Sequence, residues 1–244
     1  MEISSQRIAL VTGGNKGLGL EIVRRLADGG LRVWLGARDE ASGETAAASL
    51  RESGADVHVV CLDVTDEATI HAAVAKIEAQ DGRLDVLINN AGINDMRDGL
   101  PGKTEMDAVR RIFETNFFGT LAVTQAMLPL LRKSAAAQVI NQSSDLGSLT
   151  RQNDADWKFA FVKSLGYSAS KAALNMMTVQ LAVELKEAGI TVNSTNPGAT
   201  ATDLNGHRGF QTVEQGATPA VTLALSTKSD ISGAFFGVGK MDPW

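Results

Sequence analysis

The chain has 244 residues, 44% of them hydrophobic, which suffices for a full core and favours one domain over residues 1–244. With 23 basic and 28 acidic residues, and no long basic run, nothing indicates a surface for nucleic acid or membrane. Cys61 is the single cysteine, which excludes an internal disulfide, and the three histidines do not form a metal-ligand pattern. Because signal-peptide features and membrane-length apolar runs are lacking, we expect a cytoplasmic protein, without metal, that acts on a small molecule.

Apolar runs and amphipathic stretches alternate along the chain, a pattern typical of α/β proteins. The predicted strands cover residues 7–12, 31–37, 57–63, 84–90, 137–143, 190–196 and 233–238. Helical spacing is found over residues 18–26, 66–80, 106–133, 168–188 and 213–225. Strands that are continuously apolar are buried on both faces. We therefore predict a single-domain, doubly wound Rossmann fold, with a mostly parallel seven-stranded sheet and helices on both faces.

The segment VTGGNKGLGLEIVRRLA, residues 11–27, joins the first predicted strand to the first predicted helix. Gly13, Gly17 and Gly19 leave a backbone with few Cβ atoms, which a bulky anion can approach closely. The N–H groups and the dipole at the start of a helix favour negative charge there. A strand, a glycine turn and a helix in this order predict a site for the pyrophosphate of a dinucleotide. The missing GK[ST] ending argues against a nucleotide triphosphatase.

Further motifs follow the glycine turn in a fixed order. They are LDVTD at 62–66, NNAG at 89–92, NFFG at 116–119, NQSSDLG at 141–147, YSASK at 167–171 and NPGATAT at 196–202. With TGxxxGxG at 12–19, they make the chain resemble the short-chain dehydrogenase/reductase family over almost its whole length. Lys16, Arg38, the closing FFGVGKMDPW and the spacing before Tyr167 resemble the NADPH-dependent carbonyl-reductase branch.

The resemblance implies four catalytic residues, which are Asn116, Ser144, Tyr167 and Lys171. It also implies a set of contacts to the cofactor from the glycine turn and from the ends of the strands. These residues are Gly13, Asn15, Lys16, Gly17, Leu18, Arg38, Asp63, Val64, Asn90, Ala91, Gly92, Tyr167, Lys171, Pro197, Gly198, Thr200 and Thr202.

YSASK also makes chemical sense by itself. Tyr167 is the only tyrosine, and Lys171 lies one helical turn further on the same face. We expect the lysine ammonium to lower the pKa of the phenol toward neutrality. Tyr167 would then protonate a carbonyl oxygen while the nicotinamide delivers hydride to the carbon. Without the glycine turn, the same spacing would indicate only a surface pair.

Two polar residues complete the predicted reaction site. The Ser144 hydroxyl would bond the substrate oxygen as charge develops there. Ser143 is the competing candidate. Adjacent strand residues point to opposite faces, so only one of the two serines can face the site, and the family pattern S-x-x-G selects Ser144. Asn116 falls inside a predicted helix, where asparagine has poor propensity. The resemblance implies that its backbone carbonyl holds a water linked to Lys171, and the alternative is a buried, hydrogen-bonded side chain.

The residues after the second predicted strand bear on the choice of cofactor. An acid there would favour a free 2′-hydroxyl, whereas this chain has Arg38, which can clamp a phosphate. Lys16 can approach the same phosphate as a point charge. We therefore predict NADP(H), although Asp39 is an acid one position later and either base could be an ordinary solvated charge.

Residues 151–166 form an insertion before Tyr167, and residues 199–211 form the predicted substrate loop. The insertion carries Trp157, Phe159 and Phe161, which either wall the substrate pocket or cover a helix. The oligomeric state stays open between a homo-oligomer, as a dimer or tetramer, and a monomer.

The predicted function is reversible, NADPH-dependent reduction of a ketone or aldehyde. A 3-oxoacyl thioester reductase is the alternative enzyme, and it normally offers a basic surface, whereas the loop after Gly198 has only Arg208 as a permanent cation. A non-catalytic NADPH sensor is the alternative of another class. Such proteins usually lose the tyrosine or the lysine, and this chain keeps both.

Overall fold

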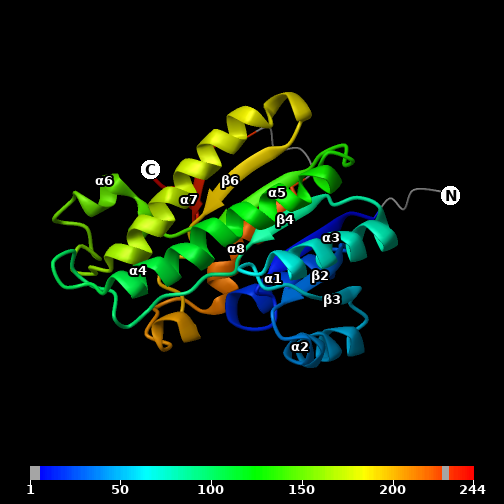
Figure 1. Ribbon diagram of the computed structural model, residues 1–244, viewed down its shortest axis with the longest axis horizontal. Helices are drawn as coiled ribbons and strands as arrows, with labels where there is room; N and C mark the ends of the chain where they lie inside the picture. Colours follow the sequence, from blue (N-terminus) through cyan, green and yellow to red (C-terminus); the bar gives the residue numbers. More distant parts are fainter. Residues whose placement is uncertain (1–5, 227–230) are drawn as a thin grey trace.

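The computed structural model describes residues 6–226 and 231–244, so residues 1–5 and 227–230 of the predicted domain lie outside the described part (Figure 1). The strands are β1 (Ile8–Thr12), β2 (Arg32–Ala37), β3 (Val57–Cys61), β4 (Val86–Asn89), β5 (Gln138–Gln142), β6 (Thr191–Thr195), β7 (Phe235–Gly237) and β8 (Lys240–Met241). The α-helices are α1 (Gly17–Asp28), α2 (Glu40–Glu52), α3 (Glu67–Asp81), α4 (Met106–Phe113), α5 (Thr120–Leu131), α6 (Leu149–Gln152), α7 (Leu165–Glu184) and α8 (Val213–Leu225). Shorter turns are η1 (Glu114–Gly119), η2 (Asp145–Gly147), η3 (Lys186–Ala188) and η4 (Asp203–Asn205).

The described strands form one sheet in the order β3-β2-β1-β4-β5-β6-β7-β8, and every neighbouring pair is parallel except β7 with β8. The order reverses between β1 and β4, which is where ligands bind in open sheets of this kind. The predicted fold class is confirmed. The predicted number of seven strands is wrong by one, because the two-residue β8 folds back on β7 and is too short to give a periodic signal.

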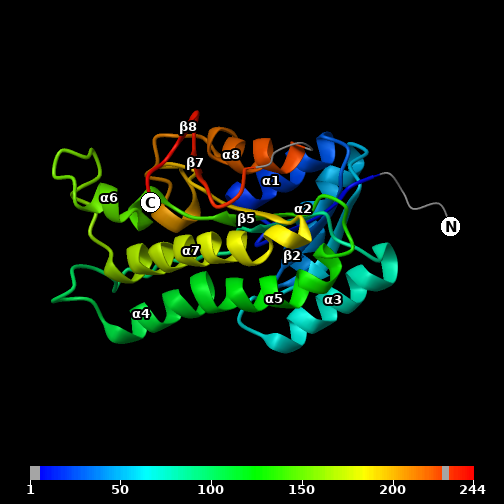
Figure 2. The ribbon, with the colours of Figure 1, turned by 90° about the horizontal axis from the view of Figure 1, so that it is seen from above.

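Helices cover both faces of the sheet, as Figure 2 shows. One apolar cluster joins β1 and β2 to the inner sides of α1, α2 and α8, and it includes Ile22, Leu35 and Val221. The other joins the sheet to α3, α5 and α7, and it includes Met127 and Leu174. Within the described ranges, none of the helices combines the length and apolar composition needed to cross a membrane.

The predicted helix over residues 106–133 is interrupted. The wider π-helical turn η1 separates α4 from α5. At its end, Gly119 packs so closely on Val64 that a Cβ atom would lie 2.7 Å from the Val64 carbonyl oxygen. In its middle, the Asn116 side chain accepts a hydrogen bond from the Ile93 N–H, after β4, and the Asn116 carbonyl oxygen accepts one from the Thr120 hydroxyl. These contacts, which the apolar pattern does not encode, accompany the inserted residue that widens the turn.

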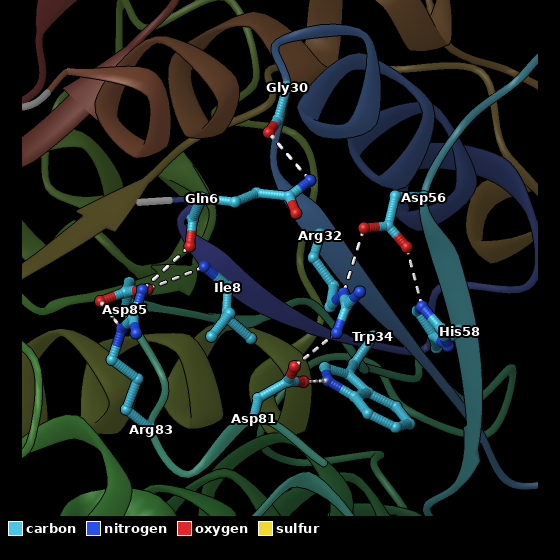
Figure 3. Close-up of polar contacts among 10 residues, drawn as sticks. All are labelled: Gln6, Ile8, Gly30, Arg32, Trp34, Asp56, His58, Asp81, Arg83 and Asp85. Carbon is cyan, nitrogen blue, oxygen red and sulfur yellow. Dashed lines mark hydrogen bonds and ion pairs between the residues drawn. The ribbon is translucent and has the colours of Figure 1, made fainter. Parts of the chain in front are cut away.

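The edge of the sheet at the strand N-termini is closed by a network of polar contacts (Figure 3). The Asp81 carboxylate accepts hydrogen bonds from the Trp34 indole and from Arg32, each at 2.7 Å. Arg32 also pairs with Asp56, and the His58 ring lies 2.8 Å from the same carboxylate. Trp34 is 1% exposed, so its N–H group depends on Asp81 for a partner.

We predict that Asp81→Ala destabilises the fold by about 2–3 kcal/mol, because it leaves the buried Trp34 N–H and one side of Arg32 without their partner. Thermal and urea unfolding measure this. Glu78→Ala in the same helix is the matched control, since its pair with Lys133 is exposed and should cost under about 1 kcal/mol. Equal effects of the two substitutions would contradict the role assigned to Asp81.

Candidate active site

The glycine turn between β1 and α1 has the conformation that its sequence predicts. Gly13 and Gly17 have φ of 62° and 52°, a region that favours glycine. A Cβ atom on Gly19 would overlap the Gly13 carbonyl oxygen and the Asn90 side chain. Asn90 donates to the carbonyl oxygens of Thr12 and Gly13 at 2.9 and 3.1 Å. The NNAG motif therefore holds the glycine turn from the neighbouring strand β4.

The residues predicted to select the cofactor lie near this turn. Arg38 follows β2 and is exposed to solvent. Asp39 is occupied otherwise, because its carboxylate caps α2 by accepting from the Ser42 N–H at 2.7 Å. Lys16 forms an exposed ion pair with Asp203 at 2.6 Å. This pair links the glycine turn to the predicted substrate loop, which the sequence did not indicate.

Tyr167 and Lys171 lie one turn apart on α7, and both are buried. Burial raises the pKa of Tyr167 to about 12, with the charge of Asp145 acting in the same direction and a hydrogen bond with Ser144 opposing it. Burial also lowers the pKa of Lys171 to about 8. The prediction that Lys171 brings the pKa of Tyr167 toward neutrality is therefore wrong, because desolvation is the largest influence on the phenol and Lys171 is not among the groups that shift its pKa.

The Lys171 ammonium points to the end of the sheet. It donates to the Gln142 carbonyl oxygen at 2.7 Å and lies 5.7 Å from the centre of the Tyr167 ring. A Cβ atom on Gly92 would lie 3.5 Å from this nitrogen and 3.4 Å from Asn116 Oδ1. The lysine, the π-helical asparagine and the end of NNAG therefore converge on one small volume.

Asn116 is fully buried, and its side chain bridges two segments. Its Oδ1 accepts from the Ile93 N–H at 2.8 Å, and its Nδ2 donates to the Ile93 carbonyl and to the Ser170 hydroxyl. Ser170 lies between Tyr167 and Lys171 in sequence. Asn116 thus ties the chain after β4 to the helix that carries the tyrosine and lysine, as expected for a buried, hydrogen-bonded asparagine.

The two adjacent serines separate as the sequence pattern predicts. Ser144 follows β5, caps η2 by accepting from the Leu146 N–H, and acts to lower the pKa of the Tyr167 phenol through hydrogen bonding. Ser143 instead faces the Lys171 carbonyl oxygen, 3.5 Å from its hydroxyl. Ser144 is therefore the serine on the side of the phenol.

The remaining predicted cofactor residues surround the same edge of the sheet. Val64 is buried, and the Asp63 carboxylate accepts from both the N–H and the hydroxyl of Thr65. The Thr200 hydroxyl donates to the Pro197 carbonyl at 2.8 Å. A Cβ atom on Gly17 would contact the Thr202 side chain at 3.8 Å. The other members of the predicted set are Asn15, Leu18, Ala91 and Gly198, which lie in the glycine turn, at the start of α1, after β4 and after β6.

Asp98 is a positioning residue that the sequence reasoning missed. Its two carboxylate oxygens accept hydrogen bonds from the N–H groups of Gly166 and Tyr167, at 2.8 and 2.9 Å. It thereby caps the N-terminus of α7 from a loop far away in sequence. The only local signal is that α7 begins without an acidic residue in its first turn.

A cavity of about 180 Å³ adjoins the site. Trp157 and Phe159 of the insertion and Phe210 of the predicted substrate loop line it. The Phe159 and Phe210 rings stack with centres 6.4 Å apart, while Phe161 is 79% exposed. Trp157 and Phe159 therefore line a cavity, whereas Phe161 does not, and that this cavity is the substrate pocket stays a prediction.

Polar residues of the same cavity were also missed. Asp145 follows Ser144 directly, and Arg151 and Asp242 form a hydrogen-bonded ion pair. Asn196 donates to Asp242 at 2.7 Å. The C-terminal tail therefore contributes to the wall, because Asp242 lies after β8.

A doubly wound sheet, a glycine turn at its reversal point and a buried tyrosine–lysine pair at the same edge define a class of oxidoreductases. The model of the family described as short chain dehydrogenase matches residues 7–211. The chain belongs to this family, which confirms the resemblance inferred from the motifs.

Known members are similar over nearly their whole length. Short-chain dehydrogenase/reductase 1 of Saponaria officinalis is 33% identical, covering 99% of this chain and 97% of the relative. The (+)-neomenthol dehydrogenase of Capsicum annuum is 31% identical, covering 96% of each. The structure of an NADPH-bound carbonyl reductase from chicken fatty liver is 30% identical, with a TM-score of 0.87, covering 98% of this chain and 99% of that one.

We predict that Gly19→Ala lowers the free energy of unfolding by about 1–3 kcal/mol. Each kcal/mol should lower the melting temperature by roughly 2–4 °C. The added methyl group would overlap backbone at Gly13, which cannot move without opening the turn. Gly102→Ala is the control, since an added Cβ atom there would meet no described atom within 4 Å. A melting temperature unchanged by both substitutions would show that the turn tolerates a side chain.

Proposed function

We propose that the protein is an NADPH-dependent reductase of ketones or aldehydes that also runs in the alcohol-oxidising direction. The observation that carries this proposal is the convergence of Ser144, Tyr167 and Lys171 beside the glycine turn, at the reversal point of the sheet. The relatives support it, because one is named a neomenthol dehydrogenase and another a carbonyl reductase bound to NADPH.

The residues at the glycine turn fit a dinucleotide phosphate. The turn has positive φ at Gly13 and Gly17, and Gly19 is packed too closely to carry a side chain, so backbone can approach a pyrophosphate. Arg38 is exposed at the end of β2, while Asp39 is committed to capping α2. Arg38 is therefore the residue at this position that would contact a 2′-phosphate, in place of a carboxylate that would repel it. Lys16 would join it by exchanging its exposed pair with Asp203.

The protein residues then hold and move a proton. When bound, NADPH supplies the hydride that the carbonyl carbon accepts. Tyr167, with a pKa of about 12, stays protonated through the neutral range and can donate its proton to the carbonyl oxygen. Ser144 bonds the same oxygen as charge develops. Lys171, with a pKa of about 8, is mostly cationic at neutral pH and stabilises the phenolate that forms.

A non-catalytic NADPH sensor does not need this arrangement. Such a protein needs the glycine turn, whereas burying Lys171 and Tyr167 together carries a desolvation cost that cofactor binding alone does not require. Keeping a buried ammonium beside a buried phenol therefore favours the enzyme over the sensor.

We predict that Tyr167→Phe lowers the turnover number for any reduced carbonyl compound at least about 100-fold, since it removes the proton donor and little volume. NADPH absorbance at saturating substrate measures turnover, and fluorescence titration measures NADPH affinity, which should change less than about threefold. Near-normal turnover in the variant would remove Tyr167 from the donor role.

We predict that Arg38→Asp weakens NADPH binding at least about tenfold more than NADH binding, because a carboxylate replaces the cation opposite the 2′-phosphate. The dissociation constants of both cofactors are compared by fluorescence titration. Arg132→Asp is the control, since Arg132 is exposed after α5 and makes the same change of charge far from the turn. An equal loss for NADPH and NADH would show that Arg38 does not recognise the phosphate.

A further inference from the structure

Asp145 places a carboxylate between the reaction site and the cavity. Its Oδ1 atom lies 3.5 Å from the Ser144 hydroxyl, and its charge acts on Tyr167. Its side chain also lines the cavity that Trp157 and Phe159 wall. In the proposed function, Ser144 and Tyr167 bind the carbonyl oxygen of the substrate. Asp145 would then face the part of the substrate next to the carbonyl group.

The surroundings of this carboxylate combine burial with nearby charges of both signs. Burial and the charge of Asp242 raise the pKa of Asp145, the charge of Arg151 acts in the opposite direction, and Asn196 donates to the Asp242 carboxylate at 2.7 Å. Arg151 is committed to Asp242, and within the described ranges Asp145 has no cation within ion-pair distance. Two further cations, Lys158 and Lys240, line the cavity, and the Lys158 ammonium lies over the Phe159 ring at 4.7 Å. Asp145 therefore keeps acceptor capacity for a hydrogen-bond donor that enters the cavity.

We propose that Asp145 selects carbonyl compounds that carry a hydroxyl group on the carbon next to the carbonyl. The carbonyl oxygen would lie at Ser144 and Tyr167, and the adjacent hydroxyl would donate to Asp145. This inference rests on the proposed reductase function and names its substrate class. The oxygens of such a compound are three bonds apart, a span comparable with the separation of the Ser144 hydroxyl from the Asp145 carboxylate.

The same carboxylate disfavours an acid at that position. A substrate with a carboxylate next to its carbonyl would bring two negative charges together in a partly buried site, which is costly. An aryl ring on the other side of the carbonyl would contact the aromatic wall of the cavity. The hydroxy ketone gains a hydride from NADPH at carbon and a proton from Tyr167 at oxygen, giving a vicinal diol and NADP⁺.

Three aryl ketones that differ only beside the carbonyl test this proposal. They are acetophenone, 2-hydroxyacetophenone and phenylglyoxylate, which carry a methyl, a hydroxymethyl and a carboxylate group. The unaltered protein should have a kcat/KM for the hydroxy ketone at least about tenfold above that for acetophenone, and phenylglyoxylate should be the poorest substrate. Asp145→Ala should remove the hydroxy preference mainly through KM, while acetophenone changes less than about threefold.

Two further variants and a binding measurement separate the explanations. Asp145→Asn keeps the size and removes the charge, so phenylglyoxylate should improve at least about tenfold. Asp156→Ala removes an exposed acid of the insertion, residues 151–166, outside the cavity lining, and should change none of the three ratios. Calorimetric titration of 2-hydroxyacetophenone in the presence of NADP⁺, where reduction does not occur, should show the same loss of affinity in Asp145→Ala.

The outcomes distinguish this proposal from the function on which it rests. The substrate proposal is overturned if the protein reduces acetophenone in preference to 2-hydroxyacetophenone. It is also overturned if the protein reduces other ketones and Asp145→Ala has no effect. Either result leaves the reductase function standing. An equal loss of kcat for all three ketones in Asp145→Ala also overturns it, because Asp145 would then orient Ser144. Failure to oxidise NADPH with any ketone or aldehyde of a broad panel overturns the function and the substrate class together.

Discussion

The buried ammonium of Lys171 is the group around which this edge of the protein is arranged. A buried cation is tolerated only where polar atoms surround it. Here the Gln142 carbonyl at the end of β5 accepts its hydrogen bond, while Gly92 after β4 and Asn116 in η1 lie beside it. The end of β5, the chain after β4 and the turn η1 must therefore meet around the Lys171 ammonium. The parallel sheet provides that place, since the carboxyl ends of β4 and β5 are neighbours.

The same burial determines which form of the tyrosine the protein holds. Desolvation disfavours the phenolate of Tyr167 and the ammonium of Lys171 alike, so it raises one pKa and lowers the other. The resting protein thus holds a neutral Tyr167 phenol next to the Lys171 ammonium. This cation would stabilise the phenolate once the phenol has lost its proton. In the proposed reaction, such a site would favour proton donation to a carbonyl oxygen at neutral pH, and the proposed reverse reaction would depend on a higher pH.

Local patterns predicted the elements, and long-range contacts account for what they missed. The apolar run at residues 7–12 gave β1 to within one residue, because a strand buried on both faces leaves an unbroken signal. The interruption of the helix at Asn116 depends on Ile93 and Val64, which lie far away in sequence. Motifs indicated Ser144 and Tyr167, whereas Asp98 and Asp145 were not indicated, because their roles follow from where separate loops meet.

The residues proposed to perform chemistry and those proposed to select a substrate are attached to the fold in different ways. Tyr167 and Lys171 share one long helix, which Asp98 caps, so their relative position is fixed by regular backbone. The cavity has no such frame. The insertion is held to the C-terminal tail by the ion pair of Arg151 with Asp242, and to the predicted substrate loop by stacking of Phe159 on Phe210. Just before the insertion, the Thr150 hydroxyl donates to the Trp244 carbonyl oxygen. Because those contacts join three separate segments rather than one regular element, we expect a change in any one of them to reshape the cavity while the tyrosine–lysine pair stays in place.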